Sequence, residues 1–246
     1  MEFIRKAIAV PFTILFFFCF FFTLIVFHAF QWTAINVFGA KTHKIVVDYM
    51  AKCLLWCHLV LGNIFSYKNP YTLPKDRPLI IVSNHQSMFD IPLILWYMRK
   101  HTTKFISKIE LGKGIPSISY NLRHGGNALI DRKNPNQSIP ELARFGKFIK
   151  ENNFAAVIFP EGTRSRTGKP KKFATTGLKI LFKHIPDAVV VPVTINNSWK
   201  LLQYGNFPMG IGIRCTLEVK EPIELAGADQ DQLIATLEEQ VTSTIK

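Results

Sequence analysis

The stretch "PLIIVSNHQSMFDIP", residues 78–92, joins an almost entirely apolar run to a short polar segment. A continuous apolar run of this length is typical of a strand that is covered on both faces of a sheet. His85 and Asp90 follow the run directly, where such a strand would end. Ligands of open α/β sheets bind beyond the carboxyl ends of the strands, so this stretch predicts an α/β fold with a site at that edge.

Along the rest of the chain, predicted strands alternate with predicted helices. The strands are expected at residues 78–83, 103–107, 126–130, 155–159, 188–195 and 211–219. A helix is predicted over residues 138–153, where Ser138 and Glu141 have capping-box spacing. In the tail, apolar residues recur at helical spacing at Leu233, Leu237, Val241 and Ile245. The alternation predicts a mostly parallel or mixed sheet flanked by helices.

The N-terminal part of the chain is strongly apolar. No Asp, Glu, Lys or Arg occurs over residues 7–40, and the centre of this run reads "PFTILFFFCFFFTLIVFHAF". About 20 apolar residues are enough for a helix to cross a bilayer. The run exceeds the apolar core of a usual signal peptide and no clear small-x-small cleavage site follows it, which favours an uncleaved anchor.

A second apolar segment, residues 45–67, is interrupted by Asp48 and Lys52. Its uncharged part is short for a membrane span and better suited to a helix that lies in the membrane interface. The sequence therefore predicts a membrane-associating two-helix segment over residues 1–67, followed by an α/β domain over residues 68–246. A two-helix hairpin packed on the soluble domain is the alternative.

The chain has 30 Lys and Arg residues against 17 Asp and Glu residues, a formal net charge of +13. This excess calls for an anionic partner such as nucleic acid, a phospholipid surface or a phosphorylated substrate. No helix-turn-helix, zinc-finger or RRM pattern occurs, so together with the apolar anchor we expect no nucleic acid. Cys53, Cys57 and His58 lie among apolar neighbours, which favours packed free thiols over a metal site.

His85 and Asp90 permit two interpretations. Asp90 precedes Ile91 and Pro92, so it suits the N-cap of a helix. It can also fold back, fix the tautomer of the imidazole and leave the other ring nitrogen as a general base. Ser83 and Ser87 flank the histidine, which leaves a serine nucleophile open, although no G-x-S-x-G elbow occurs in the chain.

A second polar segment, "FPEGTRSRTGKPKK" at residues 159–172, follows another predicted strand. It combines hydroxyl groups with Arg164, whose planar guanidinium suits bidentate phosphate binding. The alternatives are a solvated basic loop and a simple ion pair between Glu161 and Arg164. Further cationic donors in the intervening segment are Lys108, Arg123 and Arg132.

Four blocks stand in order along the chain: "NHQSMFD", "GGNALIDR" with Lys108 upstream, "FPEGTRS" and "VVVPVTI". Over roughly residues 78 to 200 they resemble the glycerolipid acyltransferase family, most closely its lysophosphatidate (1-acyl-sn-glycerol-3-phosphate) acyltransferase branch. The resemblance implies that His85, oriented by Asp90, is the general base that activates a free hydroxyl. That oxygen would attack an acyl thioester with no covalent acyl-enzyme.

The resemblance also implies a set of phosphate contacts, namely Glu161, Gly162, Thr163, Arg164, Arg132 and Lys108. It implies transfer from acyl-CoA or acyl carrier protein to the sn-2 hydroxyl of lysophosphatidic acid, with no metal or cofactor. Both donors are cytosolic, so the catalytic domain is expected to face the cytoplasm from a bacterial inner membrane or its equivalent. One departure is that Pro116 is followed by Ser117, Ile118 and Ser119, whereas members often carry Gly three residues after this Pro.

Two other functions stay open at this point. An acyltransferase with another acceptor, such as a lyso-aminolipid, another lysophospholipid or glycerol 3-phosphate, would keep His85 and Asp90. A membrane-anchored protein that only binds anionic lipids would need neither of them.

Overall fold

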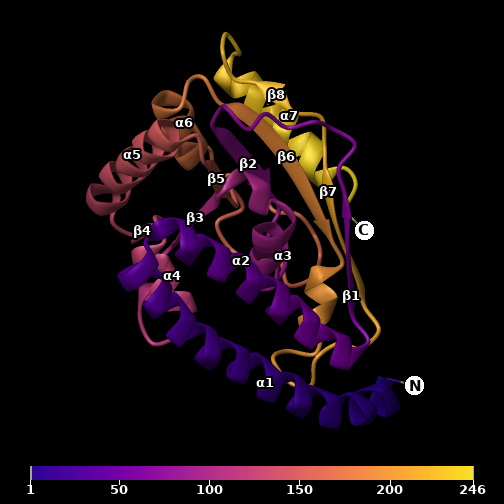
Figure 1. The fold of residues 1–246 in the computed structure, drawn as a ribbon. Helices are drawn as coiled ribbons and strands as arrows, with labels where there is room; N and C mark the ends of the chain where they lie inside the picture. The colour runs from indigo at the N-terminus through magenta and orange to yellow at the C-terminus, as the bar shows by residue number, and fades with distance from the viewer. Residues whose placement is uncertain (1, 246) are drawn as a thin grey trace.

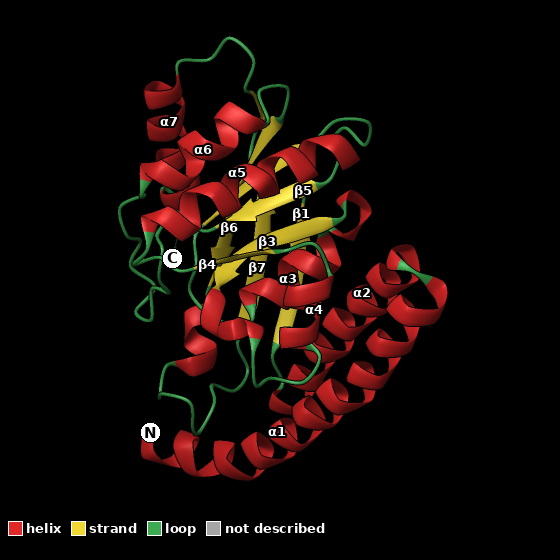
Figure 2. Cartoon of the chain, turned by 90° about the vertical axis from the view of Figure 1, so that its left-hand side faces the viewer, coloured by secondary structure: helices red, strands yellow, loops and turns green. Residues whose placement is uncertain are grey.

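The computed structural model describes residues 2–245, which form one sheet between two layers of helices (Figures 1 and 2). The strands are β1 (Ile64–Lys68), β2 (Leu79–Ser83), β3 (Thr103–Lys108), β4 (Ala128–Ile130), β5 (Ala155–Ile158), β6 (Val189–Asn196), β7 (Arg214–Val219) and β8 (Ile223–Glu224). The α-helices are α1 (Glu2–Thr33), α2 (Ala40–Cys57), α3 (Asp90–Tyr97), α4 (Ile118–His124), α5 (Pro135–Asn152), α6 (Thr175–His184) and α7 (Gln230–Thr242).

The sheet has eight strands in the order β1-β7-β6-β2-β5-β3-β4, with β8 paired to β6. The strands β6, β2, β5, β3 and β4 run parallel to one another. Strand β7 is antiparallel to β6, and β8 is too. The predicted α/β fold with a mostly parallel, mixed sheet is therefore confirmed.

Strand β2 shows why the apolar runs in the sequence are continuous. Leu79 and Ile81 pack in one core with α1, α2 and α3, whereas Ile80 and Val82 pack in the other with α5, α6 and α7. Successive side chains of a strand point to opposite faces, and here helices cover both faces. Figure 2 shows these two helical layers on either side of the sheet.

Helices α1 and α2 lie side by side, with α1 along the lower edge of the molecule in Figure 1. Helix α1 buries a stripe at helical spacing that includes Thr13, Phe16, Phe20 and Leu24, while much of its remaining apolar surface is exposed. Among the described residues, the helical stretch Glu2–Phe38 alone is long and apolar enough to cross a membrane. Whether α2 also contacts the membrane stays a prediction.

The end of the second apolar segment differs from the prediction of a helix up to residue 67. Helix α2 stops at Cys57, and a short 3-10 turn ends at Gly62, where φ is +65°. A positive φ is accessible to Gly without steric strain, so the helix can end here. Residues 64–68 then form the edge strand β1, which pairs in parallel with β7. The sheet thus begins before residue 68.

Helix α5 begins three residues earlier than predicted. Its N-cap is Asn134 and Pro135 occupies the first turn, so the capping box expected at Ser138 and Glu141 does not form. Proline fixes φ at a helical value and has no N–H to satisfy, which makes it a favourable first residue. Helix α7 buries Leu233, Leu237 and Val241 as predicted from their spacing, but it ends at Thr242, so Ile245 lies outside it and is only partly buried.

Candidate active site

The polar segments identified in the sequence meet at one edge of the sheet. His85 follows β2, Glu161 follows β5, Lys108 ends β3 and Arg132 follows β4. These four strands are parallel, so their carboxyl ends lie at the same edge. Segments that are far apart along the chain therefore form one site.

His85 and Asp90 form a hydrogen-bonded pair. Nδ1 of His85 lies 2.9 Å from Oδ2 of Asp90, and the Asp90 carboxyl group is fully buried. A carboxylate accepts hydrogen bonds, so the imidazole donates through Nδ1–H and keeps Nε2 free of a proton. The side chain of His85 retains 16% exposure, which leaves Nε2 accessible as a base.

Asp90 does not cap the helix that it begins. Its Oδ2 accepts hydrogen bonds from the backbone N–H groups of Gln86 at 2.7 Å and Ser87 at 2.8 Å, both of which precede it. The N-cap of α3 is Phe89, without a side-chain hydrogen bond. The N-cap interpretation of Asp90 is therefore wrong: the carboxylate folds back over the loop and fixes both the loop and the imidazole.

The ring of His85 stacks on Phe159, with ring centroids 4.2 Å apart and planes 19° from parallel. Offset stacking of this kind restricts rotation about the outer side-chain bond. Phe159 begins the "FPEGTRS" block, but no role for its side chain was predicted from the sequence. The stacking depends on strand pairing that places the end of β5 beside the end of β2.

Glu161 supports residues 84–89, the loop that carries His85 and is here called the histidine loop. Its carboxylate accepts hydrogen bonds from the backbone N–H of His85 at 3.0 Å and of Lys171 at 3.2 Å. Burial raises the pKa of Glu161 to about 7, although both backbone donors favour the ionised form. Because its oxygen atoms already accept these bonds, Glu161 acts here by positioning the loops, and no ion pair with Arg164 occurs among residues 2–245.

Residues 159–172, here called the basic loop, fold back onto the histidine loop. The backbone N–H of Ser165 donates to the carbonyl of His85 at 2.7 Å. The ammonium group of Lys171 donates to Oγ1 of Thr163 at 2.8 Å and to the carbonyl of Arg164 at 3.1 Å. Internal hydrogen bonds thus hold the loop in one shape although many of its residues are exposed, and the loop keeps the Arg164 backbone close to His85.

Asn84, which sequence analysis did not single out, fixes the chain directly before His85 by bonding to β6. Its amide donates to the carbonyl of Ile195 at 2.8 Å and accepts from the N–H of Ile195 at 2.7 Å. The side chain thereby continues the β2–β6 pairing by one position. All eight residues of β6 are buried, as expected for "VVVPVTI".

His85 opens into a cavity of about 950 Å³. Helices α1 to α4 give this cavity an apolar lining, here called the apolar channel, which includes Phe20, Met50, Leu54, Leu95, Ile118 and Leu122. The loops at the strand ends give it a basic lining, here called the basic rim, which consists of Lys108, Arg132, Arg164, Arg166, Lys169 and Lys171. Ser83 and Ser87 are fully buried and do not line the cavity, so neither is placed to act as a nucleophile.

The Gly that members often carry three residues after Pro116 is replaced here by Ser119, which lies in α4 and needs no positive φ; its hydroxyl donates to the carbonyl of Leu111 at 2.8 Å. The backbone turns at Ser117, whose φ of +61° is unusual for a residue other than Gly. Its N–H donates to Nδ1 of His28 at 3.1 Å and its hydroxyl donates to the carbonyl of Leu24 at 2.7 Å. These two bonds attach the start of α4 to α1, next to the apolar channel.

The family model described as Acyltransferase matches residues 64–196, which is more than half of the chain. The chain belongs to the Acyltransferase family. This acyltransferase is similar over its whole length to a solved structure, that of the 1-acyl-sn-glycerophosphate (LPA) acyltransferase PlsC from Thermotoga maritima. The TM-score is 0.78 with 27% sequence identity, and the match covers 99% of this chain and 95% of the other.

Curated relatives named 1-acyl-sn-glycerol-3-phosphate acyltransferase also match. The acyltransferase is 30% identical over 166 residues to the protein from Cocos nucifera, covering 67% of this chain and 49% of the relative. It is 23% identical over 210 residues to that from Haemophilus influenzae, covering 74% and 84%. The chain thus spans about half the length of the coconut relative and most of the bacterial one. The resemblance found in the four sequence blocks is confirmed.

Proposed function

We propose that this chain transfers an acyl group from acyl-CoA or acyl carrier protein to the free sn-2 hydroxyl of lysophosphatidic acid. The product is phosphatidic acid, an intermediate for phospholipid biosynthesis. The observation that carries the proposal is the pair of His85 and Asp90, 2.9 Å apart, in a cavity with both a basic and an apolar lining. The names of the matching relatives point to the same acceptor.

The reaction follows from the state of the imidazole. Nε2 of His85 removes the proton from the sn-2 hydroxyl as the oxygen attacks the thioester carbonyl carbon. The tetrahedral intermediate then breaks its carbon–sulfur bond, and the thiolate takes the proton back from the imidazolium. Asp90 stabilises the imidazolium and keeps the correct tautomer throughout. The products are an ester and a free thiol, and no acyl-enzyme forms.

The basic rim supports binding of the glycerol phosphate. Arg164 provides a planar donor pair for phosphate, and Arg132 and Lys108 add positive charge from neighbouring strand ends. Gly162 has a φ of +71° and lines the same cavity, which allows the backbone to approach the ligand closely. Glu161 contributes by holding the loop in shape, because a carboxylate beside a phosphate would repel it.

The apolar channel suits the acyl chain of the donor. Its walls come from helices α1 to α4, and α1 also carries the exposed apolar surface that favours membrane association. Lysophosphatidic acid resides in the bilayer, whereas acyl-CoA and acyl carrier protein are cytosolic. We therefore place the protein on the membrane with its catalytic domain in the cytoplasm, with α1 and α2 as the membrane-associating pair.

The decisive experiment uses the full chain in mixed micelles with lysophosphatidic acid and an acyl-CoA. Thiol release and phosphatidic acid, detected by mass spectrometry, should appear together in equal amounts. His85→Ala should reduce the rate by about 10²–10⁴-fold, which is the usual contribution of a general base. His184→Ala, a histidine on α6 outside the cavity, is the matched control and should keep the wild-type rate.

Two outcomes would redirect the proposal. If the wild type is inactive with both acyl-CoA and acyl carrier protein donors, lysophosphatidic acid is the wrong acceptor and other lyso-lipids or glycerol 3-phosphate should be tested. If activity survives in His85→Ala, the imidazole is not the base and the mechanism fails.

A further inference from the structure

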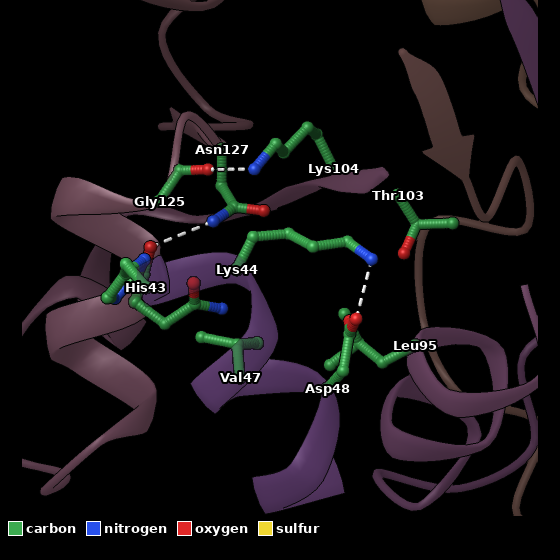
Figure 3. Close-up of a pocket in the computed structure, with 10 residues that line it drawn as sticks. His43, Lys44, Val47, Asp48, Leu95, Thr103, Lys104, Gly125 and Asn127 are labelled. Carbon is green, nitrogen blue, oxygen red and sulfur yellow. Dashed lines mark hydrogen bonds and ion pairs between the residues drawn. The ribbon is translucent and has the colours of Figure 1, made fainter. Parts of the chain in front are cut away.

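Two groups of polar side chains lie outside the active-site cavity, and they hold different parts of the chain. The first lines a small cavity between α2 and β3, where Nζ of Lys44 donates to Oδ2 of Asp48 at 2.5 Å (Figure 3). It fills the junction between helix and sheet. The second group contacts both loops of the active site. It consists of the three residues that follow β6, here called the bridge segment: Asn197, Ser198 and Trp199.

The bridge segment begins where β6 runs past the end of β2. Strand β6 pairs with Ser83, the last residue of β2, at Val193 and continues to Asn196. Asn197 then turns the chain with a φ of +65°, a left-handed conformation that Asn adopts more readily than most residues. The short 3-10 turn Ser198–Leu202 follows. The chain therefore enters this turn alongside the histidine loop, which begins directly after β2.

Gln86 joins the histidine loop to the bridge segment. Its Oε1 accepts hydrogen bonds from the N–H of Ser198 at 3.1 Å and from the hydroxyl of Ser198 at 3.3 Å. The backbone N–H of Gln86 in turn donates to Oδ2 of Asp90 at 2.7 Å. Gln86 is 2% exposed and Ser198 is 1% exposed, so water does not compete for these bonds. The side chain of Gln86 thus fixes one of the N–H groups that hold the Asp90 carboxylate.

The chain is held on both sides of His85. Asn84 bonds to Ile195 of β6, and Gln86 bonds to Ser198 just after β6. His85, between them, lines the cavity. Because both neighbours are attached to one continuous stretch of chain, that stretch determines where the imidazole lies in the cavity. A misplacement of about 1 Å at a reacting group can lower a rate about 10²-fold.

Trp199 contacts the basic loop at Gly168. A Cβ at Gly168 would lie 2.3 Å from Nε1 and 2.7 Å from Cδ1 of Trp199, so the indole rests directly on the Gly168 backbone. Within residues 166–170, Gly168 alone is buried and the other four residues are exposed. The indole therefore anchors the outer part of the basic loop at this point.

These contacts form a closed ring. The basic loop bonds to the histidine loop through the N–H of Ser165 and the carbonyl of His85. The histidine loop bonds to the bridge segment through Gln86, and the bridge segment returns to the basic loop through Trp199. Each loop is therefore fixed both by the other loop and by a segment that does not line the cavity.

We propose that Ser198 and Trp199 are positioning residues for the acyl transfer. Ser198 acts through Gln86 on the pair of His85 and Asp90, and Trp199 acts on the basic rim by anchoring the basic loop. This inference rests on the proposed function, because it takes the histidine as the base and the basic rim as the phosphate site. The two contacts have separate kinetic effects. Loss of the first lowers kcat, and loss of the second raises KM for lysophosphatidic acid.

Gln86→Met tests the first contact, because it keeps the length of the side chain and cannot accept a hydrogen bond from Ser198. In mixed micelles with lysophosphatidic acid and an acyl-CoA, kcat should fall by about 10- to 100-fold. KM for both substrates should stay near the wild-type value, since Gln86 does not line the cavity. Thr194→Val is the matched control. It removes a buried hydrogen bond from the same strand β6 to the carbonyl of Val241, and it should leave kcat unchanged.

A double-mutant cycle distinguishes positioning from a general loss of stability. Ser198→Ala removes the hydroxyl donor and keeps the N–H, so kcat should fall by about two- to tenfold. In the Gln86→Met background the same change should have no further effect, because the acceptor is already absent. Gln86→Asn, which retracts the amide by one methylene, takes the place of Gln86→Met in the cycle if the latter does not fold. Additive effects would overturn the link between Ser198 and Gln86.

Trp199→Ala tests the second contact. We expect KM for lysophosphatidic acid to rise by about tenfold, because the loop must then be ordered when the phosphate binds. The fall in kcat should be smaller than this rise. Trp199→Phe keeps an aromatic ring over Gly168 and should restore most of the binding.

The positioning role is overturned if the wild type is active and both Gln86→Met and Trp199→Ala keep its kinetics. It is also overturned if the two variants change kcat and KM in the same proportion, since the two contacts would then have no separate effects. Failure of the proposed function is recognised separately. In that case the wild type turns over neither donor with lysophosphatidic acid.

Discussion

The carboxylate of Glu161 accepts a hydrogen bond from the backbone N–H of His85 at 3.0 Å, so a residue of the "FPEGTRS" block fixes the main chain of the proposed general base. The same carboxylate holds the N–H of Lys171, on the far side of the basic rim. The blocks "NHQSMFD" and "FPEGTRS" therefore form one structural unit, joined through Glu161. A substitution in the basic loop should therefore affect the position of the imidazole, and a substitution next to His85 should affect the basic loop.

Glu161→Gln should weaken this unit, because an amide presents one acceptor and directs its NH₂ group at the second backbone donor. We expect a loss of about 1–3 kcal/mol in the free energy of unfolding and a fall in kcat that exceeds the rise in KM. Thermal unfolding and steady-state kinetics measure the two effects. Glu151→Gln, at an exposed position of α5, is the control, and equal effects in both variants would contradict a bracing role.

In Asp90→Asn the amide oxygen can take the place of Oδ2, which accepts from Nδ1 of His85 and from the N–H groups of Gln86 and Ser87, so the loop should keep its shape. The uncharged amide cannot stabilise the imidazolium, so kcat should fall by about 10²-fold or more. The binding of lysophosphatidic acid should change little, because Asp90 is fully buried and does not line the cavity. An unaltered kcat would show that Asp90 is purely structural.

Arg164 should contribute binding through both charge and geometry. Arg164→Lys keeps the charge but loses the planar pair of donors, and Arg164→Ala loses both. We expect KM for lysophosphatidic acid to rise modestly in the first variant and about tenfold or more in the second, since a hydrogen bond to a charged group contributes about 1.5–3 kcal/mol. Lys172→Ala, which lies outside the cavity lining, is the control. A neutral effect of both Arg164 variants would remove this residue from the phosphate site.

Gly168→Ala should disturb the basic loop by a steric route. A Cβ at this position would lie 2.3 Å from Nε1 of Trp199, and the φ of Gly168 is +77°. The loop or the indole must move, so we expect reduced activity and a lower melting temperature. Gly205→Ala is a matched control, because its φ of +95° is also positive but a Cβ there has no atom within 4 Å. Equal effects of the two variants would assign the loss to backbone strain alone.

Lys104 should make stability depend on alkaline pH. Its pKa is lowered from 10.5 to about 8 in the folded protein, so between these values the unfolded chain binds more protons than the folded one. Stability from this residue therefore rises as pH increases from about 8 to 10.5, by about 3 kcal/mol at most. Melting temperatures of wild type and Lys104→Met in the same micelles should diverge in this direction. Lys147→Met, at an exposed site, should follow the wild type.

The local chemistry of the site was predictable from the sequence. The apolar run before His85 indicated a strand covered on both faces, and the positions of the polar blocks after their strands indicated one edge of a parallel sheet. Both follow from the two-residue period of a strand and from the parallel order of the strands. The pairing of His85 with Asp90 was available as one of two interpretations, because a five-residue separation allows a folded-back loop as well as a helix cap.

Other features depended on contacts between residues far apart in the chain. The bracing by Glu161, the stacking of Phe159 on His85 and the pairing of Asn84 with Ile195 all require strands that are neighbours in the sheet but distant in sequence. The edge strand β1 was missed because a five-residue stretch at the end of an apolar helix gives little periodic signal of its own.

The sequence by itself determined the fold class, the order of the catalytic and basic blocks, and the apolar N-terminal helix, because each of these is written in local periodicity and residue type. The tertiary structure alone decided which partner Asp90 and Glu161 would hold, and it brought Lys44 and Asp48 of α2 beside Lys104 of β3. The physical reason is that burial and hydrogen-bond partners are properties of packing between elements, and packing brings together residues whose spacing along the chain carries no information about their contact.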